Sequence, residues 1–327
     1  MPPPSPVRPA RFAVLYALFI TSIAVLGEIV IRVYLVFNIV YDVEMTRYAN
    51  EIKVTAEPNM GHEHRPSSAA TLMGVDVSIN SDGLRDREYP IDAGGAHRTI
   101  FLGDSLTLGW GVARTDTFEF LLEERLNVDG RRPVEILNFG IGNYNTAQEV
   151  ALFEKKGLKY RPDQVVVFYF INDAEPTPGR SPWGFLGHSR LVTFYWSRIN
   201  TVLSRYSGRD FRSQYSRLYG EGQPGWQSTK AAFVRLKTLC AANGIRLRVV
   251  LLPELHDLKN PPFLREYAMV DRFLTQLDVS VLDLTSHFSK VVDPQTLWVA
   301  LDDAHPNARA HRMIADFAQQ FISPWEQ

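Results

Sequence analysis

From Thr99 onward, short apolar segments alternate with longer segments of helical periodicity. The apolar segments are rich in Val, Ile, Leu and Phe, and lie at Thr99–Leu102, Val134–Phe139, Gln164–Ile171, Ile245–Leu252 and Val279–Leu284. Helical patterns fall at Phe118–Asn127, Thr146–Lys156, Thr229–Asn243, Pro262–Leu277 and Ala308–Phe321. Continuous apolar strands separated by helices are typical of a parallel sheet covered on both faces. The sequence therefore predicts an α/β fold, a three-layer α/β/α sandwich with a parallel, flavodoxin-like sheet.

Polar residues follow three of these strand candidates where each strand ends. Gly103-Asp104-Ser105 follows the first, Asn138–Asn143 closes the second, and Asn172 follows the third. In open α/β sheets, ligands bind outside the carboxyl ends of the strands. A serine at this edge can reach a bound molecule, but its hydroxyl is a poor nucleophile until a base removes the proton.

A candidate base lies late in the chain, in Leu301–Asn307. Asp302 precedes His305 by three residues, so one turn can direct the carboxylate at the imidazole and fix its tautomer. Asp303 stands beside Asp302 and is the alternative acid, but the three-residue spacing favours Asp302. Asp104 is expected to hold the turn at the first strand end, because its side chain can accept nearby backbone N–H groups.

These segments, in this order, resemble the SGNH (GDSL-type) hydrolase family from about Thr99 to Ile322, apart from a long insertion. The resemblance implies that Ser105 is the nucleophile, His305 the base and Asn172 a side-chain donor to the oxyanion. The family's oxyanion glycine falls on Asn143, with Gly142 just before it. Asparagine is one of the few residues that tolerate positive φ. The donating backbone N–H can therefore belong to either Gly142 or Asn143.

With this chemistry the resemblance implies a serine esterase that hydrolyses acyl esters, with short-chain or acetyl esters of an envelope or extracellular carbohydrate as the expected substrate. An O-acyltransferase with the same serine, a lipase or thioesterase, and a catalytically silent glycan-binding protein are the alternatives. The implied mechanism needs no cofactor and no metal. The two histidines of His62-Glu63-His64 are too few ligands to indicate a metal site. A net charge of −1 gives no reason to expect nucleic acid as a partner.

The N-terminus has the pattern of a membrane anchor. No charged residue occurs between Phe12 and Gly27, and residues 12–40 are predicted to form a transmembrane signal anchor. No small-residue cleavage site follows, which favours an uncleaved anchor. Arg8 and Arg11 precede the span, so the positive-inside rule places residues 1–11 in the cytoplasm and the catalytic domain on the extracytoplasmic side.

Three further segments complete the predicted organisation. Residues 41–96 form a linker and hairpin region, and residues 97–327 form the hydrolase-like domain. In the hairpin region, Asn80 and Arg85 either reach the pocket rim or belong to a hairpin that caps the sheet, with Arg85 paired to a neighbouring acid. The aromatic-rich insertion 174–226 leaves the sheet at its active end. It forms a lid or binding wall, a membrane-facing surface, or a packed helical insertion.

Overall fold

The computed structural model describes residues 9–128, 132–177, 187–206 and 211–324. Its centre is a five-stranded sheet in the order β6-β5-β7-β8-β9, in which every neighbouring pair is parallel. The strands are β5 (His97–Gly103), β6 (Val134–Gly140), β7 (Gln164–Tyr169), β8 (Arg246–Leu251) and β9 (Ser280–Asp283). Each overlaps one predicted strand, so the predicted parallel sheet is confirmed.

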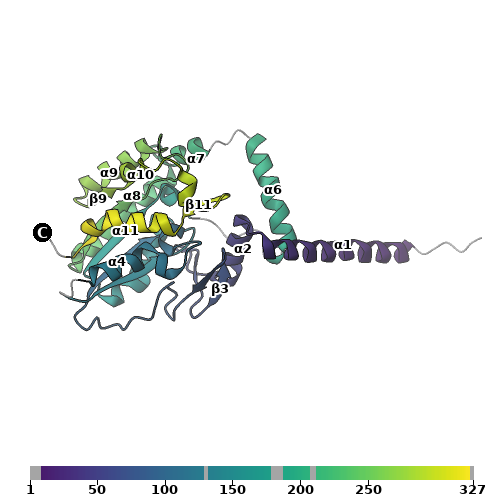
Figure 1. The fold of residues 1–327 in the computed structure, drawn as a ribbon, viewed down its shortest axis with the longest axis horizontal. Coiled ribbons are helices and arrows are strands. Elements are labelled where there is room, and N and C mark those ends of the chain that lie inside the picture. The colour runs from purple at the N-terminus through teal and green to yellow at the C-terminus, as the bar shows by residue number, and fades with distance from the viewer. Residues whose placement is uncertain (1–8, 129–131, 178–186, 207–210, 325–327) are drawn as a thin grey trace, which may run out of the picture.

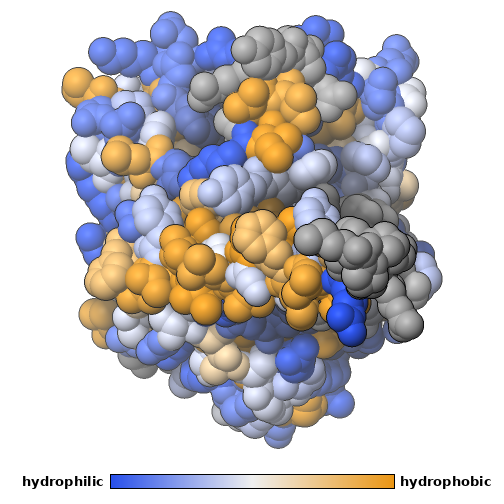
Figure 2. Space-filling model, turned by 90° about the vertical axis from the view of Figure 1, so that its right-hand side faces the viewer, coloured by the Kyte–Doolittle hydropathy of each residue, from blue (hydrophilic) through white to orange (hydrophobic). Residues whose placement is uncertain are grey.

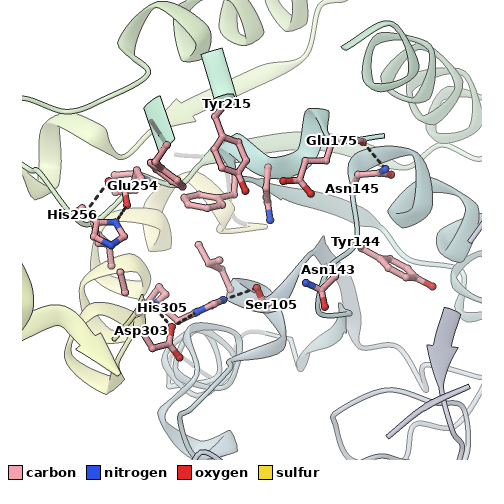
Figure 3. Close-up of a pocket in the computed structure, with 18 of the residues that line it drawn as sticks. Ser105, Asn143, Tyr144, Asn145, Glu175, Tyr215, Glu254, His256, Asp303 and His305 are labelled. Atoms are coloured by element: carbon pink, nitrogen blue, oxygen red, sulfur yellow. Dashed lines mark hydrogen bonds and ion pairs between the residues drawn. The ribbon is translucent and has the colours of Figure 1, made fainter. Parts of the chain in front are cut away.

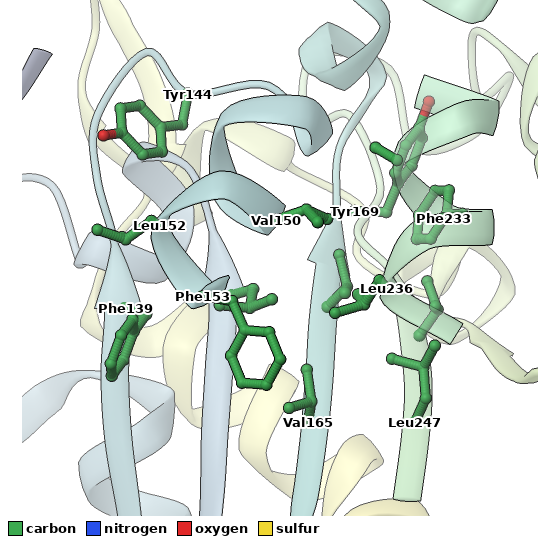
Figure 4. Close-up of a cluster of buried hydrophobic side chains, with 14 of the residues drawn as sticks. Phe139, Tyr144, Val150, Leu152, Phe153, Val165, Tyr169, Phe233, Leu236 and Leu247 are labelled. Atoms are coloured by element: carbon green, nitrogen blue, oxygen red, sulfur yellow. The ribbon is translucent and has the colours of Figure 1, made fainter. Parts of the chain in front are cut away.

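Helices cover both faces of the sheet. One face packs against α5 (Thr146–Leu152), α8 (Pro224–Ala242) and α9 (Leu264–Gln276), and the other against α4 (Phe118–Leu126), α10 (Thr285–Phe288) and α11 (Ala308–Ile322). Successive side chains of a strand point to opposite faces, so Ile100 and Leu102 join the first core and Phe101 the second. Figure 4 shows the first core, with Phe153 and Leu236 packed over Val165. Burial of each such side chain contributes about 1.5–3 kcal/mol to the free energy of folding.

Residues 41–96 form a packed layer rather than an extended linker. This layer contains α2 (Tyr41–Glu51) and two antiparallel hairpins, one of β1 (Lys53–Thr55) with β2 (His62–His64) and one of β3 (Ala69–Leu72) with β4 (Val75–Ser78). Its apolar side chains form a third core with Trp110, which follows α3 (Ser105–Leu108). The hairpins therefore support the loops that follow the first strand of the sheet.

The N-terminal helix α1 (Pro9–Phe37) projects away from the sandwich (Figure 1). Its stretch Arg11–Phe37 has a mean hydropathy of 2.3 in its most apolar window, and 6% of that window is buried. It is therefore not a core helix of the domain. The helix is long and apolar enough for a membrane span or a signal sequence.

The insertion 174–226 divides into parts with different surroundings. Tyr219 and Trp226 are buried in the first core. The helix α6 (Arg190–Tyr206) stands apart from the sandwich and joins α1 near α2, and α7 (Phe211–Leu218) lies against the domain (Figure 1). Trp183 and Phe185 lie outside the described residues. The remaining strands, β10 (Trp298–Ala300) and β11 (Asp303–Pro306), form a small antiparallel hairpin before α11.

One buried acid on α4 makes the stability of this fold depend on pH. Burial raises the pKa of Glu119 from its ordinary 4.5 to about 7, and Glu119 Oε2 has no hydrogen-bond partner among the described residues. Because the folded state holds this proton more tightly than the unfolded state, Glu119 stabilises the fold below pH about 4.5, and this contribution is lost as the pH rises to about 7.

We therefore expect the wild type to lose about 2–3 kcal/mol more unfolding free energy than Glu119→Gln between pH 5 and pH 8. Urea titrations of the full chain in detergent, followed by tryptophan fluorescence, measure this difference. Equal losses in the two proteins would show that Glu119 does not titrate in this range.

Candidate active site

The turn after β5 presents Ser105 at the carboxyl edge of the sheet. Asp104 caps α3, and its Oδ1 accepts a hydrogen bond of 2.8 Å from the Leu106 N–H, so it holds the turn as the sequence predicts. A Cβ on Gly103 would lie 2.0 Å from Thr107 Oγ1, so the turn is too tight for a side chain at that position. Ser105 is the first residue of α3, and its backbone N–H has no acceptor within the helix.

His305 lies 200 residues later in the chain and meets Ser105 directly. Its Nε2 is 2.8 Å from Ser105 Oγ, as the dashed line in Figure 3 shows. His305 belongs to β11, which follows the β10 hairpin at the same edge of the sheet. The structure therefore brings Ser105 and His305 into contact, as the resemblance to the family implies.

The acid that contacts His305 is Asp303, so the predicted contact between Asp302 and His305 is wrong. Asp303 Oδ1 is 2.5 Å from His305 Nδ1, while Asp302 is a separate residue of the pocket lining. The three-residue spacing assumed a helical turn, but the segment is a strand, in which residues two apart point to the same side. In β11, Asp303 and His305 are two apart and therefore point to the same side of the strand.

Asp303 is held in its ionised form. Its Oδ2 accepts a hydrogen bond of 2.9 Å from Trp110 Nε1, and its Oδ1 accepts a second bond from the His305 backbone N–H at 3.1 Å. Burial opposes ionisation, but the hydrogen bonds and the charge of His305 hold the pKa of Asp303 below its usual value. An ionised Asp303 fixes the proton on Nδ1 and leaves Nε2 free to accept the Ser105 proton.

The loop after β6 presents one free backbone donor. The Gly142 N–H donates to the Tyr48 hydroxyl at 2.9 Å, so it is not available to a substrate. Asn143 has a φ of 66°, lines the pocket, and its backbone N–H has no partner within the part of the chain that the structure describes. Of the two residues left open by the sequence, the geometry favours Asn143.

Three side chains from the N-terminal layer hold this loop, and sequence analysis missed them as site residues. Tyr48 accepts from Gly142, Lys53 Nζ donates to the Gly142 carbonyl at 2.7 Å and to Asn143 Oδ1 at 2.9 Å, and His62 Nε2 lies 3.0 Å from the same carbonyl. His64 is buried and contacts the Tyr48 hydroxyl through Nε2 at 2.6 Å. The two histidines that the sequence weighed as metal ligands therefore belong to the support of this loop.

Asn172 lies in the short turn Ile171–Ala174 after β7 and lines the pocket. Its Nδ2 donates to Asp104 Oδ2 at 2.8 Å. A side-chain amide carries two N–H donors, so one remains for a ligand. The bond to Asp104 fixes the amide plane beside the Ser105 turn.

Asn80 and Arg85 do not reach the pocket, which corrects the prediction of a rim position. Asn80 closes its own turn, donating to the Arg87 carbonyl and accepting from the Leu84 N–H. Arg85 is buried and donates to the carbonyls of Leu108 at 3.0 Å and Val112 at 2.7 Å. The alternative, an ion pair of Arg85 with a neighbouring acid, is also wrong. Arg85 instead ties together the loop that follows the nucleophile.

The pocket above Ser105 has a volume of about 440 Å³ and lies between β-strand ends and the insertion. Figure 3 shows Tyr215, Glu175 and His256 around it, across from Ser105 and His305. Its wall is aromatic on the insertion side, with Phe211 and Tyr215 from α7. Three carboxylates other than Asp303 line it, namely Glu175, Glu254 and Asp302.

Comparisons with known proteins identify the family of this chain. A family model described as GDSL-like lipase/acylhydrolase matches residues 101–313. A search of curated proteins found no match. Among solved structures, TesA is 14% identical with a TM-score of 0.46, over 70% of this chain and 99% of that chain. An acetylxylan esterase from Geobacillus stearothermophilus is 17% identical with a TM-score of 0.45, over 71% of this chain and 96% of that chain.

A two-domain esterase active on acetylated mannans is 17% identical with a TM-score of 0.46, over 71% of this chain and 50% of that chain. The family match spans most of the sheet and both the Ser105 and the His305 segments. This chain belongs to the GDSL-like lipase/acylhydrolase family and is an ester-hydrolysing enzyme.

Proposed function

We propose that Ser105, His305 and Asp303 carry out acyl transfer by a serine mechanism. The observation that carries the proposal is the 2.8 Å contact between Ser105 Oγ and His305 Nε2. His305 removes the Ser105 proton as the oxygen attacks the ester carbonyl, and then protonates the departing alcohol. Water, activated by the same imidazole, releases the acyl group from Ser105.

The negative oxygen of the tetrahedral intermediate rests against three donors. These are the backbone N–H groups of Ser105 and Asn143 and the free side-chain N–H of Asn172. Such donors stabilise charge only as it develops, so they accelerate the reaction rather than bind the ester more tightly.

We expect Asn172→Ala to lower kcat by roughly 10²–10³ while the fold is retained, because one oxyanion donor is removed. Hydrolysis of p-nitrophenyl acetate gives the rate, and thermal unfolding by circular dichroism checks the fold. A variant with an unchanged rate would show that Asn172 does not contact the oxyanion. A variant that loses stability instead would assign its main role to the bond with Asp104.

For the substrate, we propose short acyl esters, acetyl esters above all, on a carbohydrate. The pocket volume of about 440 Å³ suits a small acyl group together with a sugar-sized alcohol. Its lining combines aromatic rings, which stack on sugar faces, with the carboxylates of Glu175 and Asp302, which can accept hydrogen bonds from hydroxyl groups. Burying polar groups of this kind against a long alkyl chain is costly.

A series of p-nitrophenyl esters from C2 to C8 tests the acyl preference. The proposal predicts the highest kcat/KM for C2 and a fall with chain length, whereas a maximum at C8 would favour the lipase or thioesterase alternative. Product masses after incubation of an activated acetyl ester with an oligosaccharide separate hydrolysis from O-acyl transfer. Free acetate is expected, and acetylated sugar would show transferase activity.

We also propose that residues 12–40 anchor the enzyme in a membrane, with residues 1–11 in the cytoplasm and the catalytic domain outside. The exposed apolar surface of α1 needs a nonpolar environment, and lipid supplies one. Arg8 and Arg11 before the span support the orientation. A periplasmic alkaline phosphatase fused after the last residue should be active, and an inactive fusion of normal abundance would reverse the orientation.

A further inference from the structure

We propose that α6 lies in the lipid–water interface of the membrane that α1 enters, with its apolar face on the lipid, and so fixes the orientation of the catalytic domain over the membrane surface. The inference rests on the proposed anchor function of α1. It assigns a lipid-binding surface to the part of the insertion that stands apart from the sandwich.

One side of α6 is apolar and exposed. Tyr195, Ile199, Val202 and Leu203 recur at helical spacing on this side, and their exposed fractions lie between 48% and 56%. Monomeric proteins rarely leave such a stripe in water. Figure 2 views the molecule from the side on which α1 projects, and shows apolar side chains across the middle and a smaller apolar patch above them.

The start of α6 is attached to α1 where the charge-free stretch of that helix ends. Glu28 accepts hydrogen bonds from Ser189 Oγ at 2.8 Å and from the backbone N–H groups of Arg190 at 3.0 Å and Leu191 at 2.9 Å. The side chain of Glu28 thus caps the first turn of α6. A Cβ on Gly27 would lie 3.3 Å from Leu191, so the two helices are in close contact.

From this junction α6 runs across the direction of α1 rather than alongside it (Figure 1). Within the anchor of residues 12–40, the charge-free stretch Phe12–Gly27 is the part that lies in the hydrocarbon, and a helix that leaves sideways at the end of this stretch lies along the membrane surface. The side of α6 that faces α1 carries Phe194, whose ring packs on that of Tyr34 with centroids 5.8 Å apart. The exposed apolar residues lie on the other side of α6, away from this contact.

The composition of α6 fits lipid better than a second protein surface. Its sequence from Arg190 to Tyr206 has no acidic residue and contains three arginines. Helices that lie in the interface combine basic residues with an apolar face, and Trp and Tyr concentrate at the headgroup level. Anionic headgroups are the matching partner for such a basic, aromatic helix.

This placement fixes the orientation of the pocket relative to the membrane. Tyr41 follows the end of α1 by four residues, lines the pocket, and its ring centroid is 5.7 Å from that of His305. On the other side, Phe211 opens α7, the next described helix after α6, and lines the same pocket. Both chain segments that leave the membrane contact therefore contribute to the pocket wall.

The test uses the full chain reconstituted in nanodiscs of phosphatidylcholine and phosphatidylglycerol. Cys240, the one native cysteine, is buried, so a cysteine introduced at the surface takes an environment-sensitive fluorophore selectively. The labelled positions are Ile199→Cys and Leu203→Cys on the apolar face. Asn200→Cys is the matched control, about 100° around the helix from Ile199. Leu18→Cys reports on α1.

We expect lipids that carry a nitroxide near the headgroup to quench the labels at 199 and 203 several-fold more than the label at 200, which aqueous iodide should quench instead. Quenching of positions 199 and 203 by iodide alone would overturn the inference. Protection of both positions from lipid and from iodide would also overturn it, because it would place a protein surface, such as a second copy of the chain, on this face.

The Leu18 label, measured with lipids that carry the nitroxide on the acyl chain, keeps the two proposals distinguishable. Lipid quenching at position 18 without quenching at 199 and 203 would leave the anchor intact and reject the interfacial helix. Failure at position 18 would reject the anchor and the inference together. Hydrolysis of soluble p-nitrophenyl acetate by each labelled protein tests the esterase chemistry separately, and we expect it to be unchanged because none of the labelled residues lines the pocket.

Discussion

Ser105→Ala and His305→Ala are each expected to lower kcat/KM for p-nitrophenyl acetate by roughly 10³–10⁶. The reason is that the hydroxyl and the imidazole act as one unit. Alanine at 105 removes the atom that attacks, and alanine at 305 removes the only imidazole within hydrogen-bond distance of it among the described residues. Initial rates under pseudo-first-order conditions, with active-site concentration determined separately, measure the loss.

Matched controls are available on the neighbouring helix α10. Ser286 and His287 are exposed and lie outside the pocket, so Ser286→Ala and His287→Ala should retain wild-type rates. The double variant Ser105→Ala/His305→Ala should be no slower than either single variant, because the residues do not contribute independently. Additive losses in the double variant would contradict the direct partnership of the two side chains.

Asp303→Asn is expected to lower kcat by roughly 10³–10⁴, whereas Asp302→Asn should stay within about tenfold of wild type. The carboxylate of Asp303 accepts the Nδ1 proton of His305, and an amide in its place can donate to Nδ1 and so favour the wrong tautomer. Asp302 makes no contact of this kind. The two substitutions are chemically identical and one residue apart, so each is the control for the other.

The comparison requires that both variants fold. Asp303 also accepts from Trp110, so unfolding midpoints and tryptophan emission should be recorded beside the rates. A large loss in Asp302→Asn with a small one in Asp303→Asn would restore the acid that the helical spacing suggested, and would mean that the loop rearranges when substrate binds.

The sheet could be predicted from sequence because its strands are buried on both faces. Runs such as Ile100–Leu102 and Val165–Phe168 are apolar at every position, and this pattern differs clearly from the helical pattern of α4 or α11. The positions of Ser105 and Asn172 followed from the same reasoning, because parallel strands end at one edge.

The acid and the oxyanion loop could not be settled in this way, because tertiary contacts decide them. Whether Asp302 or Asp303 faces His305 depends on β11 being a strand, and a four-residue hairpin strand leaves little pattern. Whether Gly142 or Asn143 donates depends on Tyr48, which is 94 residues away and captures the Gly142 N–H. No local spacing connects these residues.

Arg85 illustrates a second limit of sequence analysis. An arginine between two aspartates predicts a solvated ion pair. Arg85 is instead buried and bound to backbone carbonyls. The burial comes from the layer of residues 41–96 packing over the loop after α3, and nothing in the local sequence requires that packing. The aromatic insertion was similarly ambiguous, since its residues serve as core at Tyr219, as pocket wall at Tyr215 and as exposed face at Trp196.

Fluorophosphonate labelling shows whether Ser105 is the nucleophile that His305 activates. The reagent reacts covalently with an activated serine, and peptide mass spectrometry locates the adduct. We expect one modification per chain, on Ser105, that is lost in His305→Ala while that variant remains folded. An unlabelled Ser105 in enzyme that still hydrolyses p-nitrophenyl acetate, or a stoichiometric adduct on another serine, would contradict it.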